Sequence, residues 1–137
     1  MDLLLHVIGY VRSPLKSREN APKMESEGAP EVWIDIDPIY AEAVDTLVPG
    51  KQILIFTWLH QADRSCLKVH PRGNPDNPLR GVFNTRSPDR PNPVGLHLVD
   101  ILEIAPGPRL CVGPLEAIDG TPVIDIKPPT GRETGTK

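Results

Sequence analysis

Proline is the feature of this sequence that most constrains its fold. The chain of 137 residues contains 17 prolines and 11 glycines, together about a fifth of its length. Proline has no amide hydrogen and its ring clashes with the preceding helical turn, so helix interiors exclude it. The glycines have no period of three, which excludes a collagen-like chain. An all-helical bundle is therefore disfavoured, and the length is that of a single domain.

The apolar segments between the prolines have the length and composition of short strands. We expect a first strand over residues 3–11, a second over residues 32–36, where apolar side chains alternate, and a buried central strand over residues 53–59. Many short strands with frequent turn signals indicate a mostly antiparallel β-barrel or sandwich. Further strands are predicted over residues 67–69, 81–84, 94–104, 110–112 and 123–126.

One short helix is predicted after the second strand. Asp37 is suited to cap it, and Pro38 suits its first position. Pro49 and Gly50 end the segment, and residues 130–137 are expected to form a flexible tail. The apolar residues that follow at helical spacing are Tyr40, Val44, Leu47 and Val48.

Charge is spread unevenly along the chain. The net charge is −3, which excludes a strongly basic nucleic-acid coat protein. The window from Arg64 to Arg90 nevertheless holds six basic residues and two acids, a local charge of +4. This patch is compatible with an anionic partner that approaches from one side. A solvated, arginine-rich loop explains the same pattern equally well.

Several common classes of protein are excluded by missing signals. Cys66 and Cys111 stand far apart, so they indicate neither a disulfide framework nor a zinc ribbon. The spacing of His60, Cys66 and His70 fits no common zinc site, and we expect no metal. The sequence has no G-x-G-x-x-G fingerprint, no P-loop and no hydrolase elbow. With no signal peptide and no long apolar run, we expect a cytoplasmic protein that does not cross a membrane.

The segment from Gly81 to Leu96 is the first candidate site. Three prolines within six residues, from Pro88 to Pro93, stiffen it and leave carbonyl oxygens unpaired by amide donors. A rigid polar loop between two strands is a good place for a ligand site. The alternative is a stiff corner whose arginines bond nearby carbonyl groups.

A second special turn lies between Leu115 and Pro122. Its Asp119-Gly120 pair is a strong turn signal, and Pro122 disfavours helix at the preceding residue. A simple hairpin turn with no ligand explains these residues as well.

Four motifs together give the sequence a family resemblance. They are TRSPDRPNPVGL at residues 85–96, YVRSP at 10–14, LHQ at 59–61 and DGTPVIDIKP at 119–128. In this order they resemble the TsaA-like family, whose best-known members are tRNA methyltransferases of the YaeB/TrmO type. The resemblance implies a single β-barrel domain over residues 1–129 that binds S-adenosylmethionine and forms a homodimer, with the cofactor near the subunit interface. It further implies N6-methylation of threonylcarbamoyl-adenosine next to the anticodon of tRNA.

The resemblance also assigns candidate binding residues. Arg90 and Asn92 are expected to contact the substrate. Pro129 stands where family members often have an aromatic residue. The long bacterial members have a second, C-terminal domain without a counterpart here, which leaves the methyl acceptor open. The cofactor-binding positions carried over are Pro14, Leu15, Lys16, His60, Gln61, Arg86, Leu96, Ala117, Ile118, Asp119 and Gly120.

Methyl transfer places simple demands on such residues. The enzyme must hold donor and acceptor in line, and a cationic sulfonium prefers carbonyl oxygens and aromatic faces. Guanidinium groups suit a carboxylate or a phosphate. The acceptor nitrogen must lose a proton, and the candidate bases are Glu116, Asp119 and His60. The alternative function is a cofactor-binding module, or a small-molecule methyltransferase, without activity on tRNA.

Overall fold

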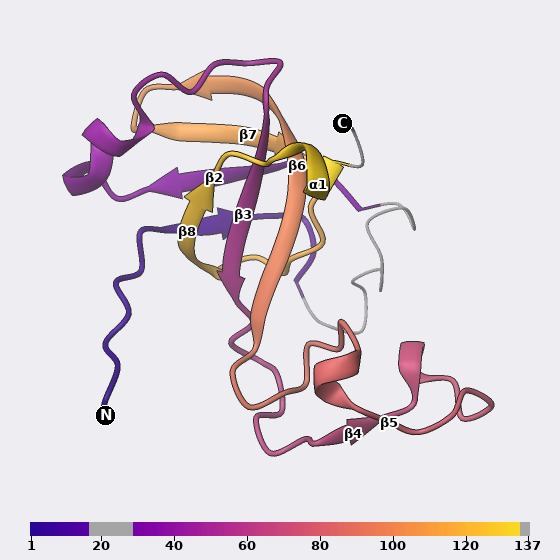
Figure 1. The fold of residues 1–137 in the computed structure, drawn as a ribbon. Coiled ribbons are helices and arrows are strands. Elements are labelled where there is room, and N and C mark those ends of the chain that lie inside the picture. Colours follow the sequence, from indigo (N-terminus) through magenta and orange to yellow (C-terminus); the bar gives the residue numbers. More distant parts are fainter. Residues whose placement is uncertain (17–28, 135–137) are drawn as a thin grey trace.

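Six antiparallel strands close into a barrel (Figure 1). The structure is a computed structural model that describes residues 1–16 and 29–134. The order around the barrel is β1-β2-β7-β6-β3-β8, and β8 pairs with β1 to close the ring. The predicted β-barrel is therefore confirmed. The strands are β1 (Gly9–Arg12), β2 (Val32–Ile36), β3 (Gln52–Trp58), β6 (Val94–Ala105), β7 (Arg109–Gly113) and β8 (Pro122–Lys127).

The long strand β6 joins the two sides of the barrel. Its first half pairs with β3, with Leu98 opposite Leu54, and its second half pairs with β7. The β6–β7 register shifts between Ile101 and Glu103, and the β3–β8 register shifts between Phe56 and Thr57. Such bulges bend a strand and increase its twist, which helps a sheet of only six strands to close.

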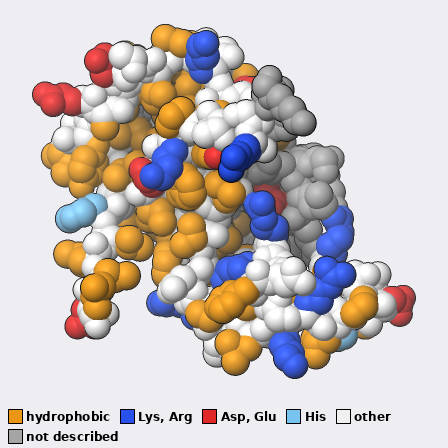
Figure 2. All heavy atoms as spheres, in the orientation of Figure 1, with side chains coloured by type: hydrophobic (Ala, Val, Ile, Leu, Met, Phe, Trp, Pro, Cys, Tyr) orange, Lys and Arg blue, Asp and Glu red, His pale blue; other side chains and the backbone are white. Residues whose placement is uncertain are grey.

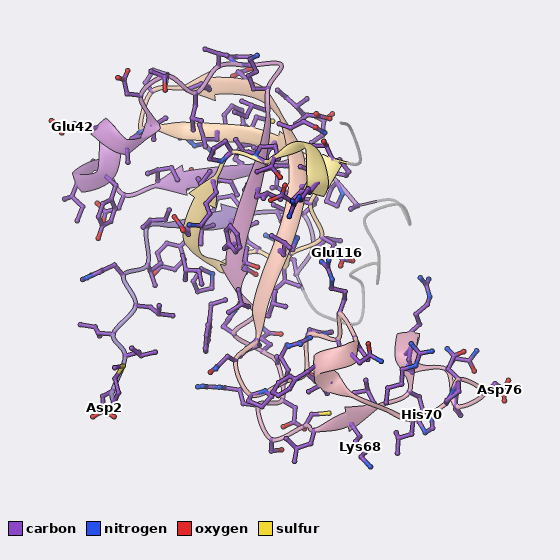
Figure 3. All side chains as sticks on the ribbon, in the orientation of Figure 1. Asp2, Glu42, Lys68, His70, Asp76 and Glu116 are labelled. Carbon is purple, nitrogen blue, oxygen red and sulfur yellow. The ribbon has the colours of Figure 1, made fainter. Side chains whose placement is uncertain are left out.

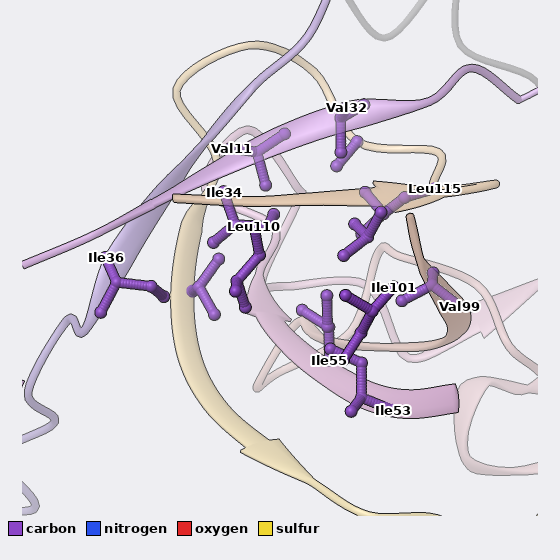
Figure 4. Close-up of a cluster of buried hydrophobic side chains, with 13 residues drawn as sticks. Val11, Val32, Ile34, Ile36, Ile53, Ile55, Val99, Ile101, Leu110 and Leu115 are labelled. Atoms are coloured by element: carbon purple, nitrogen blue, oxygen red, sulfur yellow. The ribbon is translucent and has the colours of Figure 1, made fainter. Parts of the chain in front are cut away.

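The barrel interior is filled by branched aliphatic side chains (Figure 4). Alternate residues of each strand point inward, as the period of two requires. Thr57 and His97 are buried polar side chains at one end of this core, joined by a hydrogen bond of 2.9 Å between Oγ1 and Nε2. The aliphatic core residues include Val11, Val32, Ile34, Ile53, Ile55, Val99, Ile101, Leu110, Val112, Leu115 and Val123.

The predicted short helix is present as a 3₁₀ helix, η3 (Pro38–Val44). Asp37 caps it by accepting a hydrogen bond from the Ile39 amide at 3.1 Å. Its bonds span three residues rather than four, and the backbone at Tyr40 leaves helical geometry, so no regular α-helix forms. Of the expected apolar face, Tyr40, Val44 and Leu47 pack on the core, whereas Val48 is exposed.

Two strand predictions need correction. The first strand begins at Gly9, not at residue 3, because Gly9 already pairs with Ile36, the last residue of β2. No β2 residue lies opposite residues 3–7, and their side chains are exposed. The predicted strand over residues 81–84 is reduced to β5 (Arg80–Gly81), because the chain turns into the 3₁₀ helix η5 (Val82–Asn84).

A small lobe projects from one end of the barrel (Figure 1). We define the lobe as residues 66–84, which contain β4 (Lys68–Val69), the 3₁₀ turn η4 (Pro71–Gly73), β5 and η5. The Val82 side chain in this lobe is buried, and the Val82 amide donates to the Leu67 carbonyl at 2.9 Å. Beyond β8, residues Gly131–Thr134 form one helical turn, α1. Among the described residues, no helix has the length and apolar character needed to cross a membrane.

Candidate functional site

The proline-rich loop is held rigid by two arginines. Arg90 Nη1 donates to the carbonyl oxygens of Thr85 (2.9 Å) and Ser87 (3.0 Å). Arg64 Nε donates to the Pro91 carbonyl at 2.7 Å, and its guanidinium lies 5.0 Å from the Trp58 ring centre. Three carbonyl oxygens of the loop segment, which is expected from its sequence to offer free carbonyl groups, are thus already hydrogen-bonded to arginine. These contacts agree with the alternative stated above, that the segment is a stiff corner whose arginines bond nearby carbonyl groups.

The neighbouring contacts attach this loop to the segment that follows β3. The Asp63 amide donates to Asp89 Oδ1 at 2.8 Å, and Arg64 Nη2 donates to Asn92 Oδ1 at 3.2 Å. The expected substrate residues Arg90 and Asn92 therefore both have partners within the protein. Their geometry supports a role in shaping the loop.

Arg86 is placed differently from Arg90. It is exposed and lines a groove of about 560 Å³. The groove runs along the outward face of β3 and β6, where Leu54, Leu96 and Leu98 form an apolar wall. Two residues of α1, Arg132 and Glu133, complete its lining. We call this hollow the Arg86 groove.

The residue types in the Arg86 groove fit S-adenosylmethionine. Guanidinium groups from Arg86 and Arg132 match a carboxylate, and the leucine wall matches an apolar or aromatic moiety. Glu133 is a carboxylate compatible with a cationic sulfonium or an amino group, although it also accepts hydrogen bonds from Thr130. These bonds hold the pKa of Glu133 below its ordinary value, so it stays charged.

The second predicted turn is attached to the end of β1. Asp119 Oδ1 accepts from the Ser13 amide at 3.0 Å, and Asp119 Oδ2 lies 3.2 Å from Lys16 Nζ. The Asp119 amide donates to the Leu15 carbonyl at 2.6 Å, and the Gly120 amide donates to the Val11 carbonyl at 2.7 Å. We call residues 117–120 the Asp119 turn. It brings six of the expected cofactor residues together: Leu15, Lys16, Ala117, Ile118, Asp119 and Gly120.

These contacts also bear on the candidate bases. The Ser13 amide, followed by Lys16, holds the pKa of Asp119 below its ordinary value. A carboxylate stabilised in its charged form is a weak proton acceptor. Glu116 lies three residues earlier, half-buried, with Oε2 shielded from solvent, while His60 is exposed just beyond β3. Of the three candidate bases, Asp119 is therefore the one whose surroundings stabilise its charged form.

The predicted cofactor residues thus fall into two groups. One group is the Asp119 turn with Leu15 and Lys16, and the other is Arg86 with Leu96 in the groove. Pro14, His60 and Gln61 are exposed. The first group is organised by hydrogen bonds with the end of β1, and the second by packing on the outward face of β3 and β6.

Comparison with known proteins assigns the family. A family model described as the tRNA-methyltransferase O N-terminal domain matches residues 10–131. The chain belongs to this TrmO family. A probable S-adenosyl-L-methionine-binding protein of Methanothermobacter thermautotrophicus is 48% identical over 93% of this chain and 90% of its own length. An S-adenosyl-L-methionine-binding protein of Archaeoglobus fulgidus is 42% identical over 91% of this chain and 88% of its own length.

Solved structures of TrmO share the fold. The crystal structure of TrmO from Pseudomonas aeruginosa has 28% identity and a TM-score of 0.73, over 97% of this chain and 58% of that one. A further TrmO crystal structure has 30% identity and a TM-score of 0.75, over 96% of this chain and 59% of the other. This chain therefore spans just over half the length of these TrmO chains. The family resemblance of the four sequence motifs is confirmed.

Several residues of the candidate site were not predicted from the sequence. Leu98 lines the groove because it lies two residues after Leu96 on the same face of β6, a position that alternation alone could have revealed, and Leu54 lies opposite Leu98 on β3. Arg132 and Glu133 reach it only because the chain after β8 returns beside these strands. Within residues 1–16 and 29–134, no three His, Cys, Asp or Glu side chains gather where they could hold a metal ion.

Proposed function

We propose that this chain methylates the N6 nitrogen of threonylcarbamoyl-adenosine next to the anticodon of tRNA. Membership of the TrmO family makes it an S-adenosylmethionine-dependent methyltransferase, with S-adenosylmethionine as its cofactor. The acceptor is proposed from the family, and the observation that supports methyl transfer is the Arg86 groove, where an exposed guanidinium and an apolar wall adjoin the family motif at residues 85–96. A cytoplasmic location, where tRNA is found, accompanies this proposal.

The cofactor, when bound, supplies an electrophilic methyl group on a sulfonium. Arg86 and Arg132 bind the anionic end of the ligand, and Leu96 and Leu98 bind its apolar part. The proline-rich loop orients Arg86, because hydrogen bonds from Arg64 and Arg90 fix the backbone of this loop before any ligand binds. Glu116, shielded from solvent at Oε2, takes the proton from the acceptor nitrogen.

We propose further that two copies of the chain form the complete site. The Asp119 turn and the Arg86 groove are organised separately, and a symmetric dimer can place the turn of one copy against the groove of the other. Leu96 and Val94 on the outward face of β6 are partly exposed, as an apolar interface requires.

Mixing two inactive variants tests the shared site. Lys16→Ala damages the Asp119 turn, and Arg86→Ala damages the groove; both side chains are exposed, so folding is preserved. If each site uses both copies, co-refolded mixtures recover about a quarter of the wild-type sites. No recovery, together with a dimer in sedimentation, would place both groups in one copy. A monomer in the presence of cofactor would contradict the dimer itself.

Calorimetry and methyl transfer test the activity. We expect S-adenosylmethionine to bind with equal affinity in the presence and absence of a chelator. The purified chain should then transfer a labelled methyl group to tRNA that carries threonylcarbamoyl-adenosine, and not to the same tRNA lacking that modification. Cofactor binding without transfer to either tRNA would support the alternative function, a binding module or a small-molecule methyltransferase. This alternative is favoured by the hydrogen bonds of Arg64 and Arg90 to loop carbonyl oxygens, because guanidinium groups bound in this way are less available to RNA phosphates.

A further inference from the structure

The lobe combines exposed apolar side chains with positive charge. Phe83 is 82% exposed, Leu67 67% and Leu79 54%. Lys68, Arg72 and Arg80 are also exposed, against the single acid Asp76, so residues 66–84 carry +2 in a chain whose net charge is −3. Basic side chains gather over the lobe and the adjoining end of the barrel in Figure 2, and Lys68, His70 and Asp76 project from it in Figure 3.

We infer that the lobe is a docking surface for single-stranded RNA, with Phe83 as a stacking platform. This inference rests on the proposed tRNA substrate and names the part of the chain that holds the RNA. Proteins that bind single-stranded nucleic acids combine exposed aromatic rings with cationic side chains, because bases stack on the rings and phosphates pair with the charges. RNA carries a negative charge at every nucleotide, whereas another copy of this chain carries a net charge of only −3 over 137 residues, so electrostatic attraction favours RNA.

The position of Phe83 links RNA docking to the methyl-transfer site. Phe83 belongs to η5, and the Thr85 amide and hydroxyl that follow η5 both donate to the Val82 carbonyl, at 3.1 and 2.9 Å. Arg90 then donates to the Thr85 carbonyl, which fixes the start of the loop that carries Arg86. An RNA base on Phe83 is therefore three residues along a hydrogen-bonded turn from the groove residue Arg86.

Variants of the ring separate stacking from simple hydrophobic contact. The probe is a labelled RNA hairpin with the sequence of a tRNA anticodon arm. We expect Phe83→Leu to weaken its binding about 5- to 150-fold, the range measured for loss of one base–aromatic stack, and Phe83→Trp to retain binding. The matched control is Ile39→Ala, which removes an equally exposed apolar side chain on η3, and it should leave RNA affinity unchanged.

Variants that remove the lobe's positive charges should change how RNA affinity depends on salt concentration. Lys68→Gln with Arg80→Gln should flatten the dependence of log affinity on log salt by about 1.4, since each phosphate contact to a single strand contributes about 0.7. Lys51→Gln, an exposed cation next to β3, is the control and should leave that slope unchanged. Cofactor affinity by calorimetry should equal that of the wild type in all lobe variants.

The outcomes distinguish this inference from the proposed function. If RNA binding is unchanged in both lobe variants and methyl transfer to tRNA is intact, the lobe does not bind the RNA, and the proposed function is still supported. If the lobe variants weaken RNA binding but the wild-type chain transfers no methyl group, the proposed function is wrong, and the lobe is still an RNA-binding surface. If Phe83→Leu turns a dimer into a monomer, or lowers cofactor affinity, the ring is covered by a second copy or by the cofactor and the inference is wrong.

Discussion

Gly95 is a position where an added methyl group would enter space held by a buried polar pair. It lies on β6 opposite Thr57 of β3. A Cβ there would overlap Thr57 Oγ1 and lie 2.8 Å from His97 Nε2. The Thr57–His97 hydrogen bond occupies the space that an alanine side chain needs. Gly95→Ala must therefore displace a buried polar pair.

The cost has two parts. Overpacking a core costs about 1–3 kcal/mol, and breaking a buried hydrogen bond so that its groups are left poorly paired adds about 1–3 kcal/mol. We expect the free energy of unfolding to fall by about 2–6 kcal/mol. Because Leu96 follows Gly95 directly, cofactor affinity should fall as well.

Chemical denaturation measures this loss directly. Gly81→Ala is the matched control, because a Cβ at Gly81 meets no atom within 4 Å and its φ of −60° suits alanine; its stability should stay within about 0.5 kcal/mol of wild type. Thr57→Ala should relieve Gly95→Ala, so that the double variant is more stable than additivity predicts. A Gly95→Ala variant as stable as Gly81→Ala would refute the reasoning.

Three further predictions concern single side chains. Arg86→Ala should weaken cofactor binding about 10- to 150-fold by calorimetry, whereas Arg72→Ala in the lobe should leave it unchanged; equal affinities would show that Arg86 does not contact the cofactor. Asp119→Asn should destabilise the fold by about 1 kcal/mol at neutral pH, because it keeps an acceptor for the Ser13 amide but loses the negative charge that strengthens this bond and pairs with Lys16. Since the pKa of Asp119 is lowered on folding, its contribution is complete above about pH 4 and is lost as pH falls through the folded value, so wild type and variant should converge in acid denaturation curves. Asp35→Asn, which breaks exposed ion pairs with Arg12 and Arg109, should cost only about 0.5–1 kcal/mol and less in high salt, as thermal melts at two salt concentrations will show.

The strands could be predicted where composition and pairing agree. Residues 32–36 alternate, and residues 53–59 are almost entirely apolar, so both signals match the strands β2 and β3 closely. Residues 3–7 are equally apolar, but β2 ends at Ile36 and offers them no partner. A strand needs a neighbour as well as the right side chains, and the sequence of one strand does not specify where its neighbour ends.

The candidate site divides in the same way. The prolines predicted a stiff loop, and the contacts of Arg64 and Arg90 with its carbonyl groups agree with that rigidity. Which arginine binds the loop and which faces a groove depends on where carbonyl oxygens point after folding, so residue type alone does not distinguish Arg86 from Arg90, and only the family resemblance gives them different roles. The contribution of Arg132 depends on the path of the chain after β8, which no local pattern records.

Mass spectrometry of tRNA nucleosides tests the central claim most directly. A host that lacks its own enzyme of this family is supplied with the wild-type chain or with Arg86→Ala, and its tRNA is digested to nucleosides. The account predicts that threonylcarbamoyl-adenosine is converted to a product heavier by one CH₂ unit with the wild-type chain, and much less with the variant. Unmodified threonylcarbamoyl-adenosine in the presence of folded, cofactor-binding wild-type protein would contradict it.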